Sequence, residues 1–322
     1  MYMRERFHDV LPQADDVLFD ITSVARWFYM DSERENTNWQ NLPMSVPPYP
    51  VMWMEFHEPS QVFMDGALQH NVLFAGGQRG CGIQTRELPD YVQEYYAGDA
   101  YSLVCHGLEH ALGPYFDSNK AWSQVDDENE NNPRWLVDAT VYQANRDTVA
   151  SVLFASLALD NKGQCMAHAI HAHEAGCNEL VLNPTRLTNE EKQHWKGRMH
   201  SVANALSMPF FFSLALLNCR NVKTVDVPPQ PAPILKQRAK KGIPYIQYKT
   251  LEVTPLRTVR QGGTRKDGTP EPKALHFVRG HFKDFSDKGL FGKYKGVYWW
   301  DSQVRGDVAK GIVDKDYRVS HD

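Results

Sequence analysis

Residues Trp135 to His173 read WLVDATVYQANRDTVASVLFASLALDNKGQCMAHAIHAH. Two apolar runs, 135–142 and 151–159, have the length of strands. Asp160-Asn-Lys-Gly163 is a turn of the hairpin type and leads into a third apolar run at 165–173. We therefore predict a hairpin near the middle of a sheet.

Segments outside this stretch predict further elements from their hydrophobic spacing. Strands are predicted at 51–59, 70–74 and 100–105. Helices are predicted at 15–30, 87–96, 187–206 and 210–219, and a short basic helix or turn is predicted at 234–241. These elements predict an α+β fold, with a mixed sheet and packed helices in the N-terminal two-thirds of the chain.

Two polar stretches invite a ligand-binding interpretation. AGGQRGCG at 75–82 matches neither GxGxxG nor GxxxxGK[ST], so we predict a surface turn there. The acidic run DSNKAWSQVDDENENNP at 117–133 lacks the glycine and the closing glutamate of an EF-hand, so we predict a solvated loop.

Charge is divided unequally along the chain. Residues 221–322 contain 20 Lys/Arg and 11 Asp/Glu, a net charge of +9, whereas residues 1–220 contain 15 and 28, a net charge of −13. The proline-rich stretch VPPQPAP at 227–233 is close to this change and predicts a linker. We predict an acidic α+β domain at 1–226, the linker at 227–233, and a small basic β-rich module at 234–322. Either the two parts attract each other, or the basic part binds a polyanion.

Composition excludes several classes of protein. No apolar run approaches the roughly 20 residues needed to span a bilayer. The first residues, MYMRERFHDVLPQADD, lack the apolar core of a signal peptide, so we expect a cytoplasmic protein. Five scattered cysteines without a CxxC pair argue against a disulfide framework and against a cysteine-rich zinc site.

Basic and aromatic residues alternate most densely near the C-terminal end of the sequence. As one strand, HFVRGHFKDF at 276–285 places Arg279, His281 and Lys283 on one face. In GKYKGVYWW at 292–300, Lys293, Lys295, Val297 and Trp299 share one face, and we predict that Tyr294, Tyr298 and Trp300 on the other form a core face. Such cations suit phosphates, and neighbouring aromatic rings can stack on bases.

Association with DNA or RNA is therefore the leading functional hypothesis. The predicted phosphate contacts are Lys236, Arg238, Lys240, Lys241, Arg279, Lys283, Lys293, Lys295 and Arg305. An alternative binding function is that of an interaction protein whose basic module docks on an acidic partner protein.

A metal-independent nuclease is a second alternative. It requires a general acid or base beside a cation that stabilises the phosphate charge, and His281 with Arg279 meets that condition on one strand face. His276 is the further catalytic candidate, and it joins this face only if Gly280 makes a bulge. Whether the protein is an enzyme stays open at this point.

A histidine cluster at 168–173 is the candidate metal site. His168, His171 and His173 follow Cys165, and imidazole and thiolate are ligands for zinc or copper. No known ligand spacing fits the whole cluster, so a polar or interfacial role is favoured and no cofactor is expected.

The C-terminal third also carries a resemblance. The pattern HFVRGH, LFGKYKGVYWW, VRG and VDKDY, preceded by LLNCRNV and LKQRAKKGIP, resembles the C-terminal ends of hypothetical proteins of bacteriophages and prophages. It covers about residues 213–319. The resemblance implies a phage or prophage origin, hence a host bacterial cytoplasm, and implies nothing about catalysis.

Overall fold

The structure is a computed structural model of the 322-residue chain. It describes residues 2–7, 9–11, 17–30, 42–43, 45–57, 78–115, 122–125, 130–144, 149–172, 207–254, 274–278, 280–290, 292, 294–300, 303–305 and 307–312. The chain divides into two compact units. Unit 1 comprises Met1–Asn218 and Thr224–Glu252, and unit 2 comprises Cys219–Lys223 and Val253–Asp322.

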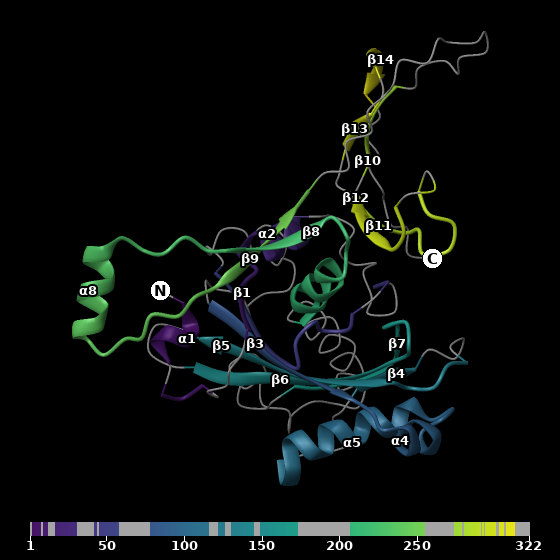
Figure 1. Ribbon diagram of the computed structural model, residues 1–322, viewed down its shortest axis with the longest axis horizontal. Helices are drawn as coiled ribbons and strands as arrows, with labels where there is room; N and C mark the ends of the chain where they lie inside the picture. Colours follow the sequence, from purple (N-terminus) through teal and green to yellow (C-terminus); the bar gives the residue numbers. More distant parts are fainter. Residues whose placement is uncertain are drawn as a thin grey trace, which may run out of the picture. The chain divides into compact units, whose positions relative to one another are not determined.

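One mixed sheet dominates the described part of the chain (Figure 1). Its nine described strands are, in spatial order, β4 (Trp122–Val125), β7 (Cys165–Ala172), β6 (Val149–Leu159), β5 (Trp135–Ala144), β3 (Gln78–Glu87), β2 (Val51–His57), β1 (Val17–Asp20), β9 (Lys249–Val253) and β8 (Val222–Asp226). From β2 to β4 all neighbours are antiparallel, whereas β1 is parallel to both β2 and β9. The predicted α+β class is confirmed.

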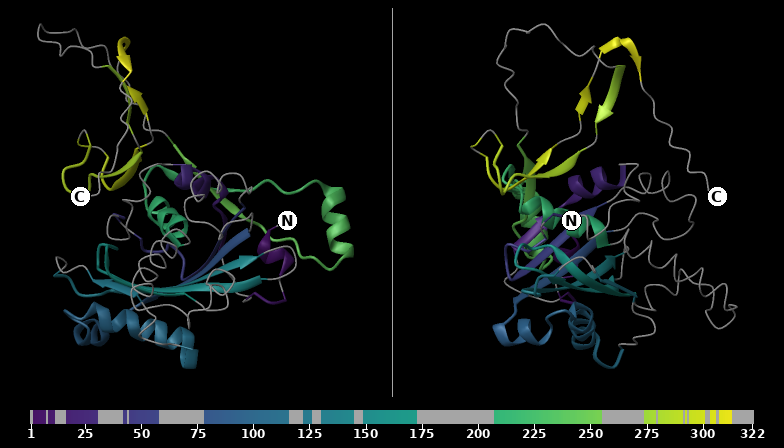
Figure 2. Two further views of the ribbon diagram at one scale, coloured as in Figure 1. Left: turned by 180° about the vertical axis from the view of Figure 1, so that it is seen from behind. Right: turned by 90° about the vertical axis from the view of Figure 1, so that its right-hand side faces the viewer.

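Helices cover both faces of this sheet (Figures 1 and 2). On one face lie α4 (Asp90–Tyr95) and α5 (Ala100–Leu112), the latter followed by the 3-10 turn η3 (Gly113–Tyr115). The helix of residues 207–217 lies on the other face, where Phe210 packs against Phe56 with ring centroids 5.4 Å apart. Close packing of α5 depends on Gly107, because a Cβ there would lie 2.2 Å from the Ser156 hydroxyl.

The predicted hairpin is confirmed, but it does not lie near the middle of the sheet, because β7 and β6 are the second and third of the nine described strands from the β4 edge. β5, β6 and β7 pair in sequence order, and Gly163 takes a positive φ of 80° in the turn between β6 and β7. Asp160 is fully buried and its Oδ1 accepts the backbone N–H groups of Lys162 and Gln164 at 2.8 and 2.9 Å. The turn therefore satisfies its own backbone donors, as a buried turn requires.

Two segments form a different element from the one predicted. The predicted helix at 15–30 is wrong in its first part, because Val17–Asp20 forms β1 and only Thr22–Met30 is helical, as α2. The predicted strand at 100–105 is wrong, because these residues begin α5, with the Asp99 side chain capping the Ser102 N–H at 3.1 Å. A short apolar run alone does not distinguish a buried strand from a buried helix.

The glycine-rich segment is also corrected. Gly80 and Gly82 lie inside β3, and Gly80 is buried under the Trp53 indole, which a Cβ at that position would approach to 2.3 Å. The predicted surface turn is therefore wrong for these two glycines, whereas Gly76 and Gly77 lie outside the described residues. Within the predicted acidic loop, Trp122–Val125 forms β4 instead.

Several other predictions are confirmed or lie outside the described residues. The buried helix predicted at 210–219 is confirmed by the helix at 207–217, and the short basic helix after the prolines is α8 (Ala232–Lys240). The strand predicted at 70–74 and the helix predicted at 187–206 lie outside the described residues. Among the helices that the structure describes, none combines the length and apolarity needed to cross a bilayer.

Unit 2 contains two small sheets among its described residues. β10 (Ala274–Val278) pairs with β13 (Gln303–Arg305) and β14 (Asp307–Ile312), and β11 (His281–Asp284) pairs with β12 (Val297–Trp300). The prediction that 276–285 is one strand is therefore wrong. β10 and β11 have different partners, so strand parity does not extend across residues 279–280.

The proline-rich stretch does not coincide with the division into compact units. Residues Thr224–Glu252, which include the prolines and α8, belong to unit 1. Independent folding of 234–322 stays a prediction.

Candidate functional site

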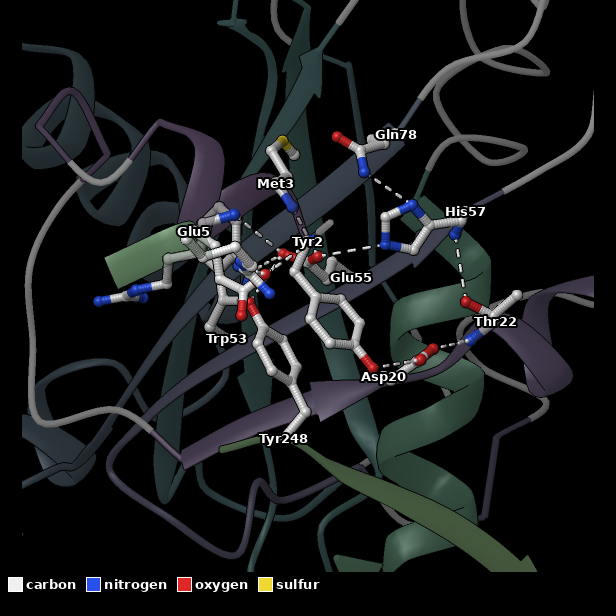
Figure 3. Close-up of polar contacts among 12 residues, drawn as sticks. Tyr2, Met3, Glu5, Asp20, Thr22, Trp53, Glu55, His57, Gln78 and Tyr248 are labelled. Atoms are coloured by element: carbon white, nitrogen blue, oxygen red, sulfur yellow. Dashed lines mark hydrogen bonds and ion pairs between the residues drawn. The ribbon is translucent and has the colours of Figure 1, made fainter. Parts of the chain in front are cut away.

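A buried glutamate organises the most elaborate polar network that the structure describes. Glu55 lies on β2 with no exposed surface, and its carboxylate accepts four hydrogen bonds (Figure 3). The donors are the backbone N–H groups of Met3 (2.8 Å) and Arg4 (3.2 Å), the Trp53 indole Nε1 (2.8 Å) and the Tyr248 hydroxyl (3.1 Å). Because a buried carboxylate is costly unless its lone pairs are satisfied, these donors make the position tolerable. Glu55 thereby ties α1 (Met3–Arg6) to the sheet.

Two tyrosines connect this network to a second carboxylate. The rings of Tyr2 and Tyr248 stack 3.8 Å apart and 18° from parallel, with their hydroxyls at opposite ends. Tyr248 donates to Glu55, and Tyr2 donates to the Asp20 carboxylate at 2.9 Å. Burial raises the pKa of both hydroxyls above its ordinary value, with further increases from Asp20 for Tyr2 and from Glu55 for Tyr248. Both hydroxyls are therefore protonated donors at neutral pH.

The carboxyl ends of two parallel strands supply the remaining polar groups. Asp20 is the last residue of β1, and His57 is the last residue of β2. The Asp20 Oδ1 accepts the Thr22 N–H at 2.9 Å, and the Thr22 hydroxyl accepts the His57 N–H at 3.2 Å. Neighbouring parallel strands place their final side chains at one edge of a sheet, where α/β proteins commonly bind ligands.

His57 has a partner on each ring nitrogen. Its Nδ1 lies 2.7 Å from the Gln78 amide nitrogen, and its Nε2 lies 3.4 Å from the Glu55 Oε1. An amide that donates to Nδ1 favours the tautomer with its proton on Nε2, directed toward the carboxylate. The network therefore orients the imidazole, whose ring centroid is 5.5 Å from that of Tyr2.

A pocket of about 380 Å³ opens beside these groups. All of its described lining residues belong to unit 1. They are Tyr2, Glu5, Asp20, Thr22, His57, Val227, Pro228, Gln230, Arg238, Tyr245, Ile246 and Tyr248. The lining thus combines carboxylates, an imidazole, tyrosine rings and a few aliphatic groups, which is the mixture expected of a small-molecule site.

Arg238 lines one side of this pocket, where it is ion-paired and not a free cation. It is buried, and its guanidinium lies 2.5 Å from the Glu5 carboxylate and 2.9 Å from the Gln230 side-chain oxygen. The predicted use of Arg238 as an exposed phosphate contact is therefore corrected. The neighbouring lysines of this helix and its C-cap, Lys236, Lys240 and Lys241, are exposed.

Apart from Arg238, the residues of this site were not among those selected from the sequence. Glu55 lies within VMWMEFH, and a charged residue in the middle of an apolar strand is the one local signal that a buried polar site was present. Its partners Met3 and Tyr248 lie 52 and 193 residues away along the chain. No spacing rule connects residues at such separations.

The β11–β12 hairpin of unit 2 carries the described part of the predicted cationic face. Lys283 on β11 places its Nζ 4.2 Å from the centroid of the Trp300 ring, and His281 on the same face is exposed. Phe282 points the other way and packs edge-on against Trp299, with centroids 4.8 Å apart. Within β11 the predicted division into a cationic and an apolar face is therefore present.

The core face predicted for Tyr294, Tyr298 and Trp300 is confirmed for Tyr298 alone. Val297, Tyr298 and Trp299 are all buried, so both faces of this strand are covered. Tyr294, which was predicted to be core, is 46% exposed, and Lys295 beside it is exposed.

A buried asparagine holds the hairpin within unit 2. Asn221 Nδ2 donates to the carbonyls of Trp299 (2.8 Å) and Thr254 (3.1 Å), and its Oδ1 accepts the Trp299 N–H at 2.9 Å. Nearby, Gly296 has a φ of 109° and lies under the Arg220 side chain, which a Cβ there would approach to 3.2 Å.

Several predicted site residues lie outside what the structure describes. These are Arg279 and Lys293, together with the side chains of His276 and Arg305. His276 is in β10 and His281 is in β11, which belong to different sheets. The nuclease hypothesis therefore stays a prediction.

The predicted metal cluster is divided by the sheet. His168 and His171 are three residues apart on β7, so their side chains point to opposite faces, opposite Leu157 and Phe154 respectively. These two histidines cannot ligate one ion, and His173 lies outside the described residues. Within the described ranges, no group of three His, Cys, Asp or Glu side chains is arranged to hold a metal.

Four of the cysteines lie in the described segments. Cys81, Cys165 and Cys219 are buried, and Cys105 is partly buried. Burial raises the pKa of Cys219 to about 12. Such a thiol is protonated at neutral pH and is a weak nucleophile, so Cys219 is a packing residue.

Comparisons of the chain with protein-family models, with curated proteins and with solved structures gave no match. A functional assignment therefore depends on the residues themselves.

Proposed function

We propose that the protein associates with nucleic acid through its phosphates, using exposed cations of unit 2. The observation that carries the proposal is the β11–β12 hairpin. Lys283 covers the Trp300 ring, and the exposed Lys295 and Lys288 follow in the connecting segment near the exposed Tyr294. Cations beside an accessible ring are the combination that holds a phosphate backbone and stacks on a base.

Charge distribution along the sequence supports this proposal. The net charge of +9 in residues 221–322 favours approach to a polyanion, and the net charge of −13 in the rest disfavours non-specific contact elsewhere. A phage or prophage origin, which the C-terminal resemblance implies, would place the protein in a host cytoplasm, where nucleic acid is the abundant polyanion.

The hairpin also limits where phosphates would bind. Asp284, the last residue of β11, and Asp287 are both exposed and precede Lys288, and Asp284 accepts hydrogen bonds from the Ser286 N–H (2.8 Å) and hydroxyl. Negative charge therefore concentrates at residues 284–287. We expect the phosphate contacts at Lys283 and Lys295, with Lys288 contributing less.

The test is salt-dependent binding of the full chain to a fluorescein-labelled 30-nucleotide single strand. Replacing Lys283, Lys288 and Lys295 together by glutamine should weaken binding about tenfold or more at 50 mM salt and reduce the salt slope by about 2 to 3. Lys162→Gln, an exposed lysine in the β6–β7 turn, is the control and should change neither. Replacing Lys236, Lys240 and Lys241 together by glutamine measures how much the lysines of α8 and its C-cap contribute to the affinity.

Two results would contradict the proposal. One is the lack of salt-dependent binding by the wild-type protein at 50 mM salt. The other is equal affinity for poly-glutamate, which would favour docking on an acidic protein partner.

A further inference from the structure

The pocket of unit 1 contains a carboxylate without a counter-charge. Asp20 lines the pocket and accepts hydrogen bonds from two neutral donors, the Tyr2 hydroxyl and the Thr22 N–H. In the described part of the chain no cationic side chain forms an ion pair with it, whereas Glu5 is already paired with Arg238. A carboxylate has about four lone-pair sites, so Asp20 retains acceptor capacity toward the pocket.

The other walls of the pocket suit the body of an organic molecule. Tyr2 and Tyr248 present a stacked pair of rings, and Tyr245 adds a ring that is 49% exposed. Val227 and Ile246 supply aliphatic surface. Tyrosine faces attract cations as well as apolar groups.

We infer that this pocket binds a small organic amine, whose ammonium group pairs with Asp20 and whose apolar body lies against the tyrosine rings. The volume of about 380 Å³ is at the small end of the range for such sites, so one compact molecule fits. This inference is independent of the proposed nucleic-acid function, because all described lining residues of the pocket lie in unit 1.

A metal ion and an anion fit the pocket less well. Hard cations such as Ca²⁺ take six to eight oxygen ligands. The described residues offer no three-member cluster of His, Cys, Asp or Glu to start such a shell. An anion would meet Asp20 directly, and the guanidinium that would attract it, Arg238, is engaged by Glu5.

The experiment compares two ligands of nearly equal shape. Calorimetry on the full chain measures binding of 2-phenylethylamine and of 2-phenylethanol, in which a hydroxyl replaces the ammonium group. The amine should bind at least about tenfold more tightly, since a charge-assisted hydrogen bond is lost in the alcohol.

A matched pair of variants locates the effect. Asp20→Asn keeps the side-chain volume and an acceptor for Tyr2, and it should lower the affinity for the amine to that for the alcohol. Asp226→Asn is the control, because Asp226 is an exposed carboxylate of the same unit that pairs with Lys249 at 2.8 Å. It should leave the preference for the amine unchanged.

If Asp20→Asn does not fold, the comparison of the amine with the alcohol on the wild-type protein still tests the inference. Lack of amine binding, equal binding of the alcohol, or a preference that survives in a folded Asp20→Asn protein would overturn the inference. Displacement of the amine by 10 mM Mg²⁺, with Mg²⁺ binding lost in Asp20→Asn, would show that the pocket is a metal site instead.

Discussion

The Glu55 network of unit 1 and the β11–β12 hairpin of unit 2 use charged side chains in opposite ways. In unit 1 the charges are buried and their partners lie inside the fold, as for Glu55 and for the pair of Arg238 with Glu5. In the hairpin the lysines remain accessible, and the contact of Lys283 is with a ring face. The first arrangement makes charges part of the fold, and the second leaves them available to a partner.

This difference has an energetic consequence. Removing a buried charge leaves its partners unsatisfied in a medium of low dielectric, whereas an exposed charge contributes little to stability. Variants of unit 1 should therefore change the free energy of unfolding, and variants of the hairpin lysines should change binding. Three further measurements test this comparison.

The largest effect is expected for Glu55→Ala. The substitution leaves the Met3 N–H, the Trp53 indole and the Tyr248 hydroxyl without their acceptor, and it should destabilise the protein by about 3–5 kcal/mol. Urea unfolding measures this change. Glu252→Ala, an exposed glutamate on β9, is the control and should stay within about 0.5 kcal/mol of the wild type. Equal stability of the two variants would show that the network does not hold the sheet and α1 together.

An intermediate effect is expected for Asn221→Ala, which tests whether unit 2 also depends on a buried polar anchor. Loss of its hydrogen bonds to Trp299 and Thr254 should lower the local stability of β12 by about 2 kcal/mol. Amide hydrogen exchange should detect the change at Tyr298 and Trp299.

The matched variant is Asn218→Ala in unit 1. Asn218 donates to the carbonyls of Val46 (2.9 Å) and Leu214 (3.0 Å), so exchange should increase in the helix of residues 207–217 and not in β12. Identical exchange changes in both variants would argue against a separation into two units.

The smallest effect is expected from the pH dependence of Tyr248. Burial raises its pKa, so the folded chain keeps a proton that the unfolded chain releases above its ordinary pKa near 10. The contribution of Tyr248 to the free energy of unfolding is therefore fully present below pH 10 and decreases as the pH rises above 10. By pH 11 the fall due to Tyr248 should be on the order of 1 kcal/mol.

Tyr248→Phe isolates this contribution. The variant should be less stable at pH 8, because Glu55 loses a donor, and it should lose less further stability between pH 9 and pH 11 than the wild type. Tyr245→Phe, at an exposed position, is the control. A wild-type pH profile that matches the Tyr248→Phe profile would contradict the assigned burial of this hydroxyl.

Prediction from the sequence succeeded where the determining interactions are local. The turn at Asp160–Gly163 depends on one carboxylate and one glycine within four residues, and the strands on either side have a regular pattern. The basic helix α8 is likewise bounded by its own prolines and by Gly242, whose φ is 70°. These elements contain their own signals.

Prediction from the sequence failed where residues distant along the chain determine the local structure. Val17–Asp20 is a strand because Met52–Glu55 pairs with it, and Gly80 is buried because Trp53 lies on it. The residues 276–285 divide between two sheets because β10 and β11 find different partners. Alternation along one segment contains no information about which strand pairs with it.

The α+β class, the hairpin of β6 and β7, the basic character of residues 221–322 and the cationic face of β11 could all be predicted from the sequence. These follow from local spacing, turn chemistry and composition. Three further features could not be predicted, because they depend on contacts that form only in the folded chain. Glu55 accepts hydrogen bonds from Met3 and Tyr248, Arg238 is paired with Glu5, and Asp20 and His57 lie at one edge of the sheet. A buried charge is stable only among specific partners, and those partners come from segments that folding alone brings together.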